Sequence, residues 1–466
     1  MKVPLDLNNT YLSKLSRFYA DSNASAIPED VLLKARRVLI DFLAEVAAGY
    51  KTGVFPAICA TYFLALGGKP EATILCYGKK VPALHGALAL GALGHSIELD
   101  DGHRWGTSHP AVAIIPAALT VAEREKADFT RLLRAIVVGY DVMLRAARAI
   151  NPSHLRRGFH STGTCGALGA AAACACLHNL DAESFAYAVS LGGLQSAGLQ
   201  EMLHDHPEVK PLQPGKAALA GVLAADLVRG GAKGPRSLFE GEHGWLKAMC
   251  HNEFSEDALM GDLGTRWEIM KTYTKLYPTC RHCHAAIDLA KEAKKTLGLS
   301  LNDIQSIHVK TYALGIVEVG QIFVPETFEE AMFSLPFSVT LALERGHVTL
   351  QDYDNESLHN EVLRQASLKI RVEEDEAMNR LYPEERGAWM KIDLHDGRSF
   401  EKYIPVAKGE PENPVSDSDL LEKLKGMVDV YYPEEFLSGL WQICVERPID
   451  SVSYGEIVDH FGRFHS

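Results

Sequence analysis

The sequence has little of what marks several large classes of protein. Its 466 residues carry 47 Lys and Arg against 60 Asp and Glu, a net charge of −13. This balance argues against a general nucleic-acid binder and against a polybasic membrane anchor, because both need a basic face, but it leaves room for a local cationic pocket. The first residues lack the apolar core of a signal peptide. A long uncharged run, residues 161–177, consists mainly of Gly, Ala, Thr and Cys and predicts an interior helix, not a membrane span.

Cysteine is also sparse and is not arranged for disulfides. The nine cysteines are odd in number, and most of them lie in apolar stretches. Buried reduced thiols fit this pattern better than a disulfide framework does. We therefore expect a cytoplasmic type of protein.

Several sequence motifs that bind cofactors or carry out hydrolysis are missing. We find no Gly-x-Gly-x-x-Gly after a strand, no phosphate-binding loop and no Gly-x-Ser-x-Gly turn around a nucleophilic serine. The run CRHCH at residues 280–284 resembles half of a zinc site, but no second pair of ligands stands at zinc spacing. We predict no nucleotide cofactor and no metal, and the roles of Cys280 and Cys283 stay open.

The pattern that is present divides the chain into a helical part and a mixed part. Apolar residues recur at helical spacing from Val31 to Val46, and small residues dominate many of the helices that follow. These helices are predicted at residues 83–96, 110–124, 130–150, 164–177, 182–190 and 216–229. We expect an all-helical domain from residues 1–266 together with 406–466, where helices are predicted at 417–428 and 433–445.

The character of the sequence changes near Trp267. Asp396-Gly397 between two alternating segments is a strong signal for a hairpin. Strands are predicted at residues 304–314, 367–372, 389–394 and 399–404, with helices at 285–297 and 336–343. We therefore predict a mainly α protein in which residues 267–405 form an α+β domain with an antiparallel sheet.

Histidines and lysines stand before several predicted helix starts. Thirteen of the nineteen histidines lie between His85 and His284. Four basic residues, His109, His160, Lys210 and Lys275, each precede a Pro- or Ser/Thr/Gly-marked helix start. A helix N-terminus with a cation beside it can bind a carboxylate or a phosphate. The alternative is that each is only a capped helix with a polar residue nearby.

An acidic stretch, ELDDGH at residues 98–103, leads into His109. Its carboxylates are suited to orient or tune a catalytic histidine. Adjacent side chains point in different directions, so at most one of Asp100 and Asp101 faces a given site. Two alternatives stay open, which are a metal site formed by Asp100, Asp101, His103 and His109, and an acidic loop exposed to solvent.

Seven stretches in this order resemble the MmgE/PrpD family, which contains 2-methylcitrate dehydratases, cis-aconitate decarboxylase and iminodisuccinate epimerase. Together they span most of the chain. They are HSIELDD (95–101), HPAVAIIPAALTVAE (109–123), GYDVMLRAARA (139–149), RGFHSTGTCGALGAAAA (157–173), KPLQPGKAALAGVLAADL (210–227), KLYPTCRHCHAAIDL (275–289) and FSLPFSV (333–339).

The resemblance implies a large helical domain made from both chain ends, a smaller α+β lid, a homodimer, no cofactor and an active site between the domains. The substrate would be a small di- or tricarboxylate, with no nucleic acid or membrane as partner. The implied catalytic residues are His109, His160, Lys210, Lys275 and Asp100. The implied substrate-binding residues are Glu98, Asp101, His103, Arg157, Gln213, Tyr277 and Arg281.

Two departures from the family pattern affect the predicted reaction. Gly102 stands where the family's Asp-Asp-Thr motif has threonine, and Gln213 where many members have histidine. Both remove hydrogen-bonding groups that could serve a leaving hydroxyl. The sequence therefore favours proton abstraction next to a carboxylate in an epimerase of the iminodisuccinate type. The alternatives are a hydro-lyase resembling 2-methylcitrate dehydratase and a non-catalytic polycarboxylate-binding protein.

Overall fold

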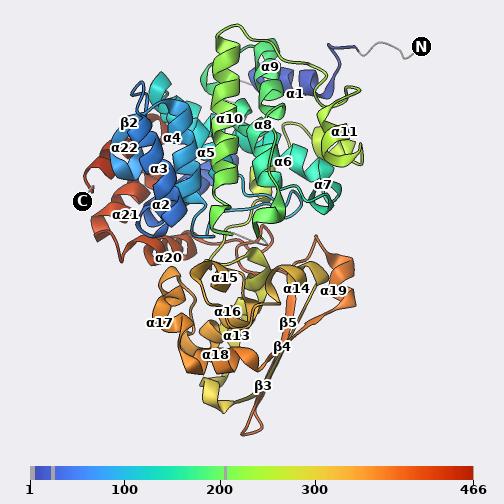
Figure 1. Cartoon of the computed structure of the whole chain (residues 1–466), viewed down its shortest axis with the longest axis vertical. Coiled ribbons are helices and arrows are strands. Elements are labelled where there is room, and N and C mark those ends of the chain that lie inside the picture. The colour runs from blue at the N-terminus through green and yellow to red at the C-terminus, as the bar shows by residue number, and fades with distance from the viewer. Residues whose placement is uncertain (1–5, 22–26, 204–206, 465–466) are drawn as a thin grey trace. The chain divides into compact units, whose positions relative to one another are not determined.

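A computed structural model describes residues 6–21, 27–203 and 207–464 (Figure 1). The first residues, which sequence analysis compared with a signal peptide, lie partly outside this range. The chain forms two compact units, residues 1–272 with 428–466, and residues 273–427. The domain boundaries predicted at 266/267 and 405/406 remain predictions. Among the described residues, no helix combines the length and apolar character needed to cross a bilayer.

The first unit is almost entirely helical, and it confirms the predicted mainly α class. A short antiparallel hairpin of β1 (Ala72–Ile74) and β2 (Lys79–Val81) accompanies the helices. The helices are α1 (Tyr11–Asp21), α2 (Glu29–Thr52), α3 (Val54–Leu66), α4 (Ala83–Gly94), α5 (Ala111–Glu125), α6 (Phe129–Ile150), α7 (Ser153–Arg156), α8 (Ser161–Leu177), α9 (Ala182–Gly193), α10 (Leu212–Arg229), α11 (Trp245–Cys250), α12 (Glu256–Met260), α21 (Glu434–Trp441) and α22 (Tyr454–Gly462).

Small residues let three of these helices pack closely. Helix α8 contacts both α6 and α10 (Figure 1) and is buried along almost its whole length, as its composition predicts. A Cβ at Gly169 of α8 would lie 2.4 Å from the carbonyl oxygen of Gly139 in α6. A Cβ at Gly221 of α10 would lie 2.3 Å from the side chain of Ala170. This packing fixes the N-terminal ends of α8 and α10, which carry His160 and Lys210.

The second unit contains a four-stranded sheet in the order β4-β3-β5-β6. Strand β3 (Ile304–Thr311) runs antiparallel to β5 (Ala388–Leu394), which pairs with β6 (Ser399–Ile404) in the predicted hairpin. Strand β4 (Ile370–Glu374) runs parallel to β3, so the sheet is mixed, and the predicted antiparallel pairing is present at β3–β5 and β5–β6. A long connection with several helices separates β3 from β4, and such a crossover permits parallel pairing.

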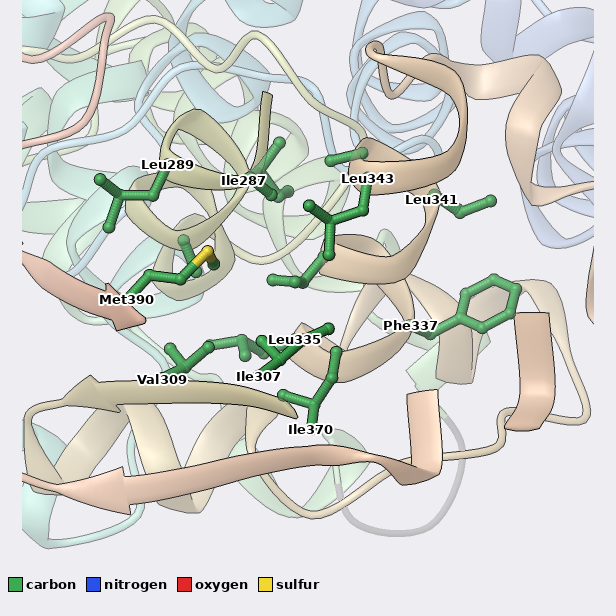
Figure 2. Close-up of a cluster of buried hydrophobic side chains, with 14 of the residues drawn as sticks. Ile287, Leu289, Ile307, Val309, Leu335, Phe337, Leu341, Leu343, Ile370 and Met390 are labelled. Atoms are coloured by element: carbon green, nitrogen blue, oxygen red, sulfur yellow. The ribbon is translucent and has the colours of Figure 1, made fainter. Parts of the chain in front are cut away.

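The core of the second unit lies between the sheet and two helices, α13 (His284–Leu297) and α16 (Leu335–Arg345). Figure 2 shows side chains from both helices facing Ile307, Val309, Ile370 and Met390 of the strands. The other helices are α14 (Ala313–Val319), α15 (Phe328–Met332), α17 (Asn355–Leu358), α18 (Glu361–Leu368), α19 (Glu376–Leu381) and α20 (Asp417–Val428).

Two predicted strands have different bounds in the structure. The strand predicted over 304–314 ends at Thr311, because Tyr312 caps α14. The strand predicted over 367–372 begins only at Ile370, because residues 361–368 complete an amphipathic helix first. In both cases a helix terminus sets the boundary of the strand.

Candidate active site

The loop between α4 and α5 brings two histidines to one carboxylate. Oδ2 of Asp100 lies 2.9 Å from Nδ1 of His95 and 3.0 Å from Nδ1 of His109. Nδ1 of His109 is also 2.9 Å from the carbonyl oxygen of Asp101. Because both of these partners can only accept a hydrogen bond, Nδ1 of His109 carries the hydrogen and Nε2 is the basic nitrogen.

The charge of Asp100 is maintained by these two histidines. Burial alone would raise the pKa of Asp100, but the charges of His95 and His109 and their hydrogen bonds lower it well below its usual value. Asp100 is therefore ionised, and it stabilises the imidazolium form of His109 in return.

Asp101 points away from this group, as its adjacency to Asp100 predicts. Its Oδ1 accepts a hydrogen bond from the backbone N–H of Ala111 at 3.1 Å, at the first residue of α5. Its Oδ2 accepts from the Tyr140 hydroxyl of α6 at 3.1 Å. Burial raises the pKa of Asp101 to about 7 in spite of these bonds. Both oxygens are thus used to join the loop to α5 and α6.

His160 is held in the same tautomer by a different partner. It caps α8, and its Nδ1 lies 2.8 Å from Oε1 of Gln213. Nε2 of Gln213 donates to the carbonyl of Leu199 at 2.6 Å, which fixes the orientation of the amide. Since Oε1 can only accept, Nδ1 of His160 carries the hydrogen and Nε2 is again the basic nitrogen.

The electrostatic surroundings of His160 are opposite to those of His109. Burial, followed by the positive charges of Lys210, His95 and His109, lowers the pKa of His160 well below its usual value. His160 is therefore neutral. His109 is also tied to α8 directly, because its backbone N–H donates to Oγ1 of Thr162 at 3.0 Å.

Lys210 forms a buried ion pair with Glu98. It stands just before α10, while Glu98 follows α4, so the pair joins segments 112 residues apart. Glu98 has a left-handed backbone with φ of 53°, which is unfavourable for a side-chain-bearing residue and often marks a functional site. The structure therefore brings together four of the five predicted catalytic residues, namely Asp100, His109, His160 and Lys210.

Two predicted substrate contacts in the first unit bind protein groups. Nδ1 of His103 accepts from the backbone N–H of Gly106 at 3.0 Å, and its Nε2 lies 3.2 Å from Oε2 of Glu268. Glu268 is buried, but hydrogen bonding and charge from His103, with further help from Arg148 and Arg266, lower its pKa to about 2. Arg157 donates to the carbonyl of Ala248. These contacts join loops, and the predicted roles of His103 and Arg157 in binding stay predictions.

The remaining predicted residues lie in the second unit. Lys275 is fully buried. Tyr277 is 4% exposed, and its hydroxyl donates to Oδ1 of Asp288 in α13 at 2.6 Å. Nε of Arg281 lies 3.0 Å from Oε1 of Glu410.

Sequence reasoning did not assign a role to His95. It stands at the end of α4, five residues before Asp100, inside a stretch that was quoted for the family resemblance. Its contact with Asp100 depends on how the chain turns after α4. Sequence spacing alone could not have distinguished it from a core histidine.

Among the described residues, one group has the spacing of metal ligands, namely His95, Asp100 and His109, whose ligand atoms lie within 4.8 Å of one another. A metal ion bound through Nδ1 of His109 would need the lone pair of that nitrogen. The contact of His109 Nδ1 with the Asp101 carbonyl requires a hydrogen on that nitrogen. The donor set therefore fits a hydrogen-bonded triad better than a metal site.

The sequence matches two domain models of one family and is similar to several known enzymes. Residues 13–257 match the MmgE/PrpD N-terminal domain, and residues 277–437 match the MmgE/PrpD C-terminal domain. A cis-aconitate decarboxylase-like protein, oryM, of Aspergillus oryzae is 23% identical over 91% of this chain and 92% of its own length. Cis-aconitate decarboxylase of Homo sapiens is 25% identical over 86% of this chain and 84% of its own length. Cis-aconitate decarboxylase of Aspergillus terreus is 24% identical over 89% of this chain and 88% of its own length.

Proposed function

This chain belongs to the MmgE/PrpD family of enzymes, and from that premise we propose that it transfers protons, without a cofactor, at the carbon next to a carboxylate of a small di- or tricarboxylate. One observation carries the proposal. His109 and His160 both have a basic Nε2, yet their surroundings favour opposite protonation states.

This difference assigns the two histidines to different steps. The ionised Asp100 stabilises protonated His109, which suits an acid. Burial and nearby cations keep His160 neutral, which suits a base. Two titratable groups whose environments favour different charge states form the usual acid–base pair of such enzymes. In this proposal His160 removes the proton and His109 donates one.

Removing a proton next to a carboxylate places negative charge on that carboxylate. Preorganised cations lower the energy of such an enediolate-like transition state. Lys210 is buried beside His160 and is held by Glu98, so it is placed to stabilise this charge. Lys275 has the same predicted role in the second unit. Each of these interactions strengthens as charge develops, which is what accelerates the step.

The proposed reaction is an epimerisation of the iminodisuccinate type. An epimerase needs one group to remove a proton and another to return one to the opposite face, which the histidine pair supplies. The first alternative is a hydro-lyase resembling 2-methylcitrate dehydratase, in which protonated His109 would donate its proton to the leaving hydroxyl. The names of the relatives add decarboxylation of cis-aconitate to the reactions that must be tested. The second alternative is a protein that binds polycarboxylates without catalysing a reaction.

Incubation with di- and tricarboxylates in D2O, followed by proton NMR, separates these possibilities. An epimerase exchanges the hydrogen next to the carboxylate and inverts the centre without a change in ultraviolet absorbance. A dehydratase produces an unsaturated acid from 2-methylcitrate, and a decarboxylase releases CO2 from cis-aconitate. Tight binding without exchange or product would contradict the proposal and identify a binding protein.

We also propose a homodimer, which the family resemblance suggests. Helix α3 offers an apolar surface for a second copy, because its sequence has no charged residue. Val54, Ile58, Tyr62 and Leu66, spaced by four, are each more than half exposed. A sedimentation mass near 51.1 kDa, that of one chain, would contradict the dimer. The nine free cysteines support the proposed cytoplasmic type of compartment.

A further inference from the structure

Lys216 is a half-buried lysine of α10 whose hydrogen bonds all end on backbone carbonyls. Its Nζ donates to the carbonyl oxygen of Ala197 at 2.8 Å. It also donates to the carbonyl oxygens of Gly163 and Gln195 at 3.3 and 3.4 Å. An ammonium group has three donors, so these three acceptors use all of them. Burial lowers the pKa of Lys216 to about 8, so the side chain is charged at neutral pH and its hydrogen bonds are charge-assisted.

Two of these carbonyls belong to residues 195–200, the segment that follows α9. None of these six residues is buried, and Leu199 is 57% exposed. A segment with so little buried surface depends on hydrogen bonds for its position. The hydroxyl of Ser196 supplies one of them, to the carbonyl of Thr164 in α8 at 2.9 Å. Lys216 supplies two more, and its third hydrogen bond reaches the first turn of α8, so it joins the segment to the start of that helix.

The same segment contacts His160 in two ways. The backbone N–H of His160 donates to the carbonyl of Gly198 at 3.1 Å. The carbonyl of Leu199 accepts from the amide of Gln213 at 2.6 Å, and Oε1 of that amide lies 2.8 Å from Nδ1 of His160. A Cβ at Gly198 would lie 2.8 Å from Oε1 of Gln213, so the segment packs directly against this amide. A displacement of the segment would therefore disturb the group that orients the imidazole.

We propose that Lys216 is a positioning residue for His160, because its ammonium group holds residues 195–200 in the place from which they orient Gln213 and, through it, the imidazole. The hydrogen bonds of Lys216 end on the segment and on α8, so its effect on His160 is indirect. The orientation keeps Nδ1 on Gln213 and leaves Nε2 as the basic nitrogen. The inference rests on the proposed function, in which His160 removes the proton, and it adds a residue to which sequence analysis assigned no role.

NMR of the full chain with labelled histidine nitrogens tests the positioning without a substrate. The nitrogen shifts report which ring nitrogen carries the hydrogen, and His160→Asn identifies the signals of His160 by their loss. In the wild type we expect the hydrogen on Nδ1. In Lys216→Met we expect a mixture of the two tautomers, because the amide that fixes Nδ1 is no longer held in one place. An unchanged His160 signal in a folded Lys216→Met variant would overturn the proposal.

Hydrogen exchange of the substrate in D2O gives a second measurement. We expect Lys216→Met to lower kcat ~10-fold, as for other groups that orient a functional histidine. KM should stay within about twofold, because the lysine orients the base and does not bind the substrate. Lys216→Arg keeps the charge and the donors and should recover most of kcat. A loss of kcat that Lys216→Arg does not recover would contradict a role of the charged donor.

Lys294→Met is the matched control. Lys294 is also half-buried, and its Nζ donates to the carbonyl of Leu299 at 2.7 Å in the second unit. Its removal takes away the same kind of hydrogen bond at a place without contact to the segment, so kcat and the His160 tautomer should both stay as in the wild type. An equal loss of kcat in Lys294→Met and Lys216→Met would show that the effect is one of general stability and would overturn the proposal.

A double variant tests the route of the effect. If Lys216 acts through Gln213, then Gln213→Leu already removes most of what Lys216 does. We therefore expect kcat of the double variant Lys216→Met, Gln213→Leu to lie close to that of Gln213→Leu alone, since residues that act through one another are not additive. Fully multiplicative losses would overturn the proposed route. Lys216→Gln, whose amide is neutral and shorter, allows the same measurements if Lys216→Met does not fold.

The two measurements separate this inference from the proposed function. If no substrate undergoes exchange but the tautomer of His160 changes in Lys216→Met, the positioning role stands and the proposed reaction fails. If exchange depends on His160 but Lys216→Met changes neither the tautomer nor kcat, the reaction stands and Lys216 does not position His160.

Discussion

The buried polar groups of the two units differ in how their charges are balanced. In the first unit His95 and His109 meet the carboxylate of Asp100 and Lys210 meets that of Glu98, whereas His160 meets the amide of Gln213. In the second unit Lys275, Arg281 and Arg386 lie near aromatic rings and one buried carboxylate, Glu410. The carboxylate of Asp100 stabilises the protonated form of a histidine beside it, whereas the cations of the second unit lower the pKa of His282 and His284. The charges packed around a buried histidine therefore decide which of its protonation states is favoured.

The largest expected effect tests whether His160 is the base. His160→Asn removes the basic Nε2, and we expect kcat to fall ~10²–10⁴-fold, the usual contribution of general acid–base catalysis. Exchange of substrate hydrogen in D2O measures the effect. His178→Asn, at the opposite end of α8, is the matched control. Exchange at a near-normal rate in His160→Asn would assign the base elsewhere.

The two lysines test the comparison across the units. Lys210→Met and Lys275→Met each remove a cation that is proposed to stabilise the developing charge, so we expect a ~10²–10³-fold loss of kcat/KM. Of these two lysines, Lys210 is the one whose charge lowers the pKa of His160. Removal of Lys210 should therefore raise that pKa, and removal of Lys275 should not. Thermal unfolding shows whether each variant is folded. A folded variant with normal turnover and affinity would leave its lysine a structural role.

The pH dependence of kcat/KM sharpens the assignment of His160. A base must be neutral, so activity is lost as the pH falls through its pKa. Because the pKa of His160 lies well below the usual 6.5, we expect the acidic limb of the profile well below pH 6.5. In Lys210→Met the limb should move to higher pH, and in Lys275→Met it should not. An acidic limb at or above pH 6.5 in the wild type would contradict a neutral His160.

Substitution of Gln213, which stands where many family members have histidine, is expected to have a smaller effect on kcat. Gln213→Leu removes the acceptor that holds Nδ1 of His160, so both tautomers become accessible. We expect a ~10-fold fall in kcat, as for other groups that orient a functional histidine, whereas Gln213→His should keep most of the activity. Equal activity in wild type and Gln213→Leu would show that the hydrogen bond does not position His160.

The smallest expected effect is that of removing metal. The His95, Asp100 and His109 group fits a hydrogen-bonded triad, so dialysis against a chelator should leave turnover unchanged. The rate before and after dialysis, with metal content measured in both samples, checks this. Loss of activity that one divalent ion restores would show that these three residues bind a metal instead.

Sequence reasoning was most successful where the signal is local. Helical spacing and small residues predicted α8 as an interior helix, and Asp396-Gly397 predicted the β5–β6 hairpin. The parallel pairing of β4 was missed, because it depends on where a long connection returns the chain. Among the site residues, His109, His160 and Lys210 stood out beside helix starts, whereas His95 carried no comparable signal.

The order of residues alone indicates which chemical groups are available and approximately where many of the helices lie, since periodicity and capping act over a few residues. Tertiary structure decided which nitrogen of each histidine is basic. Gln213 reaches Nδ1 of His160 from 53 residues away, and Lys210 reaches Glu98 from 112 residues away. Protonation depends on burial and on charges within a few ångströms, and only the packed chain fixes those distances.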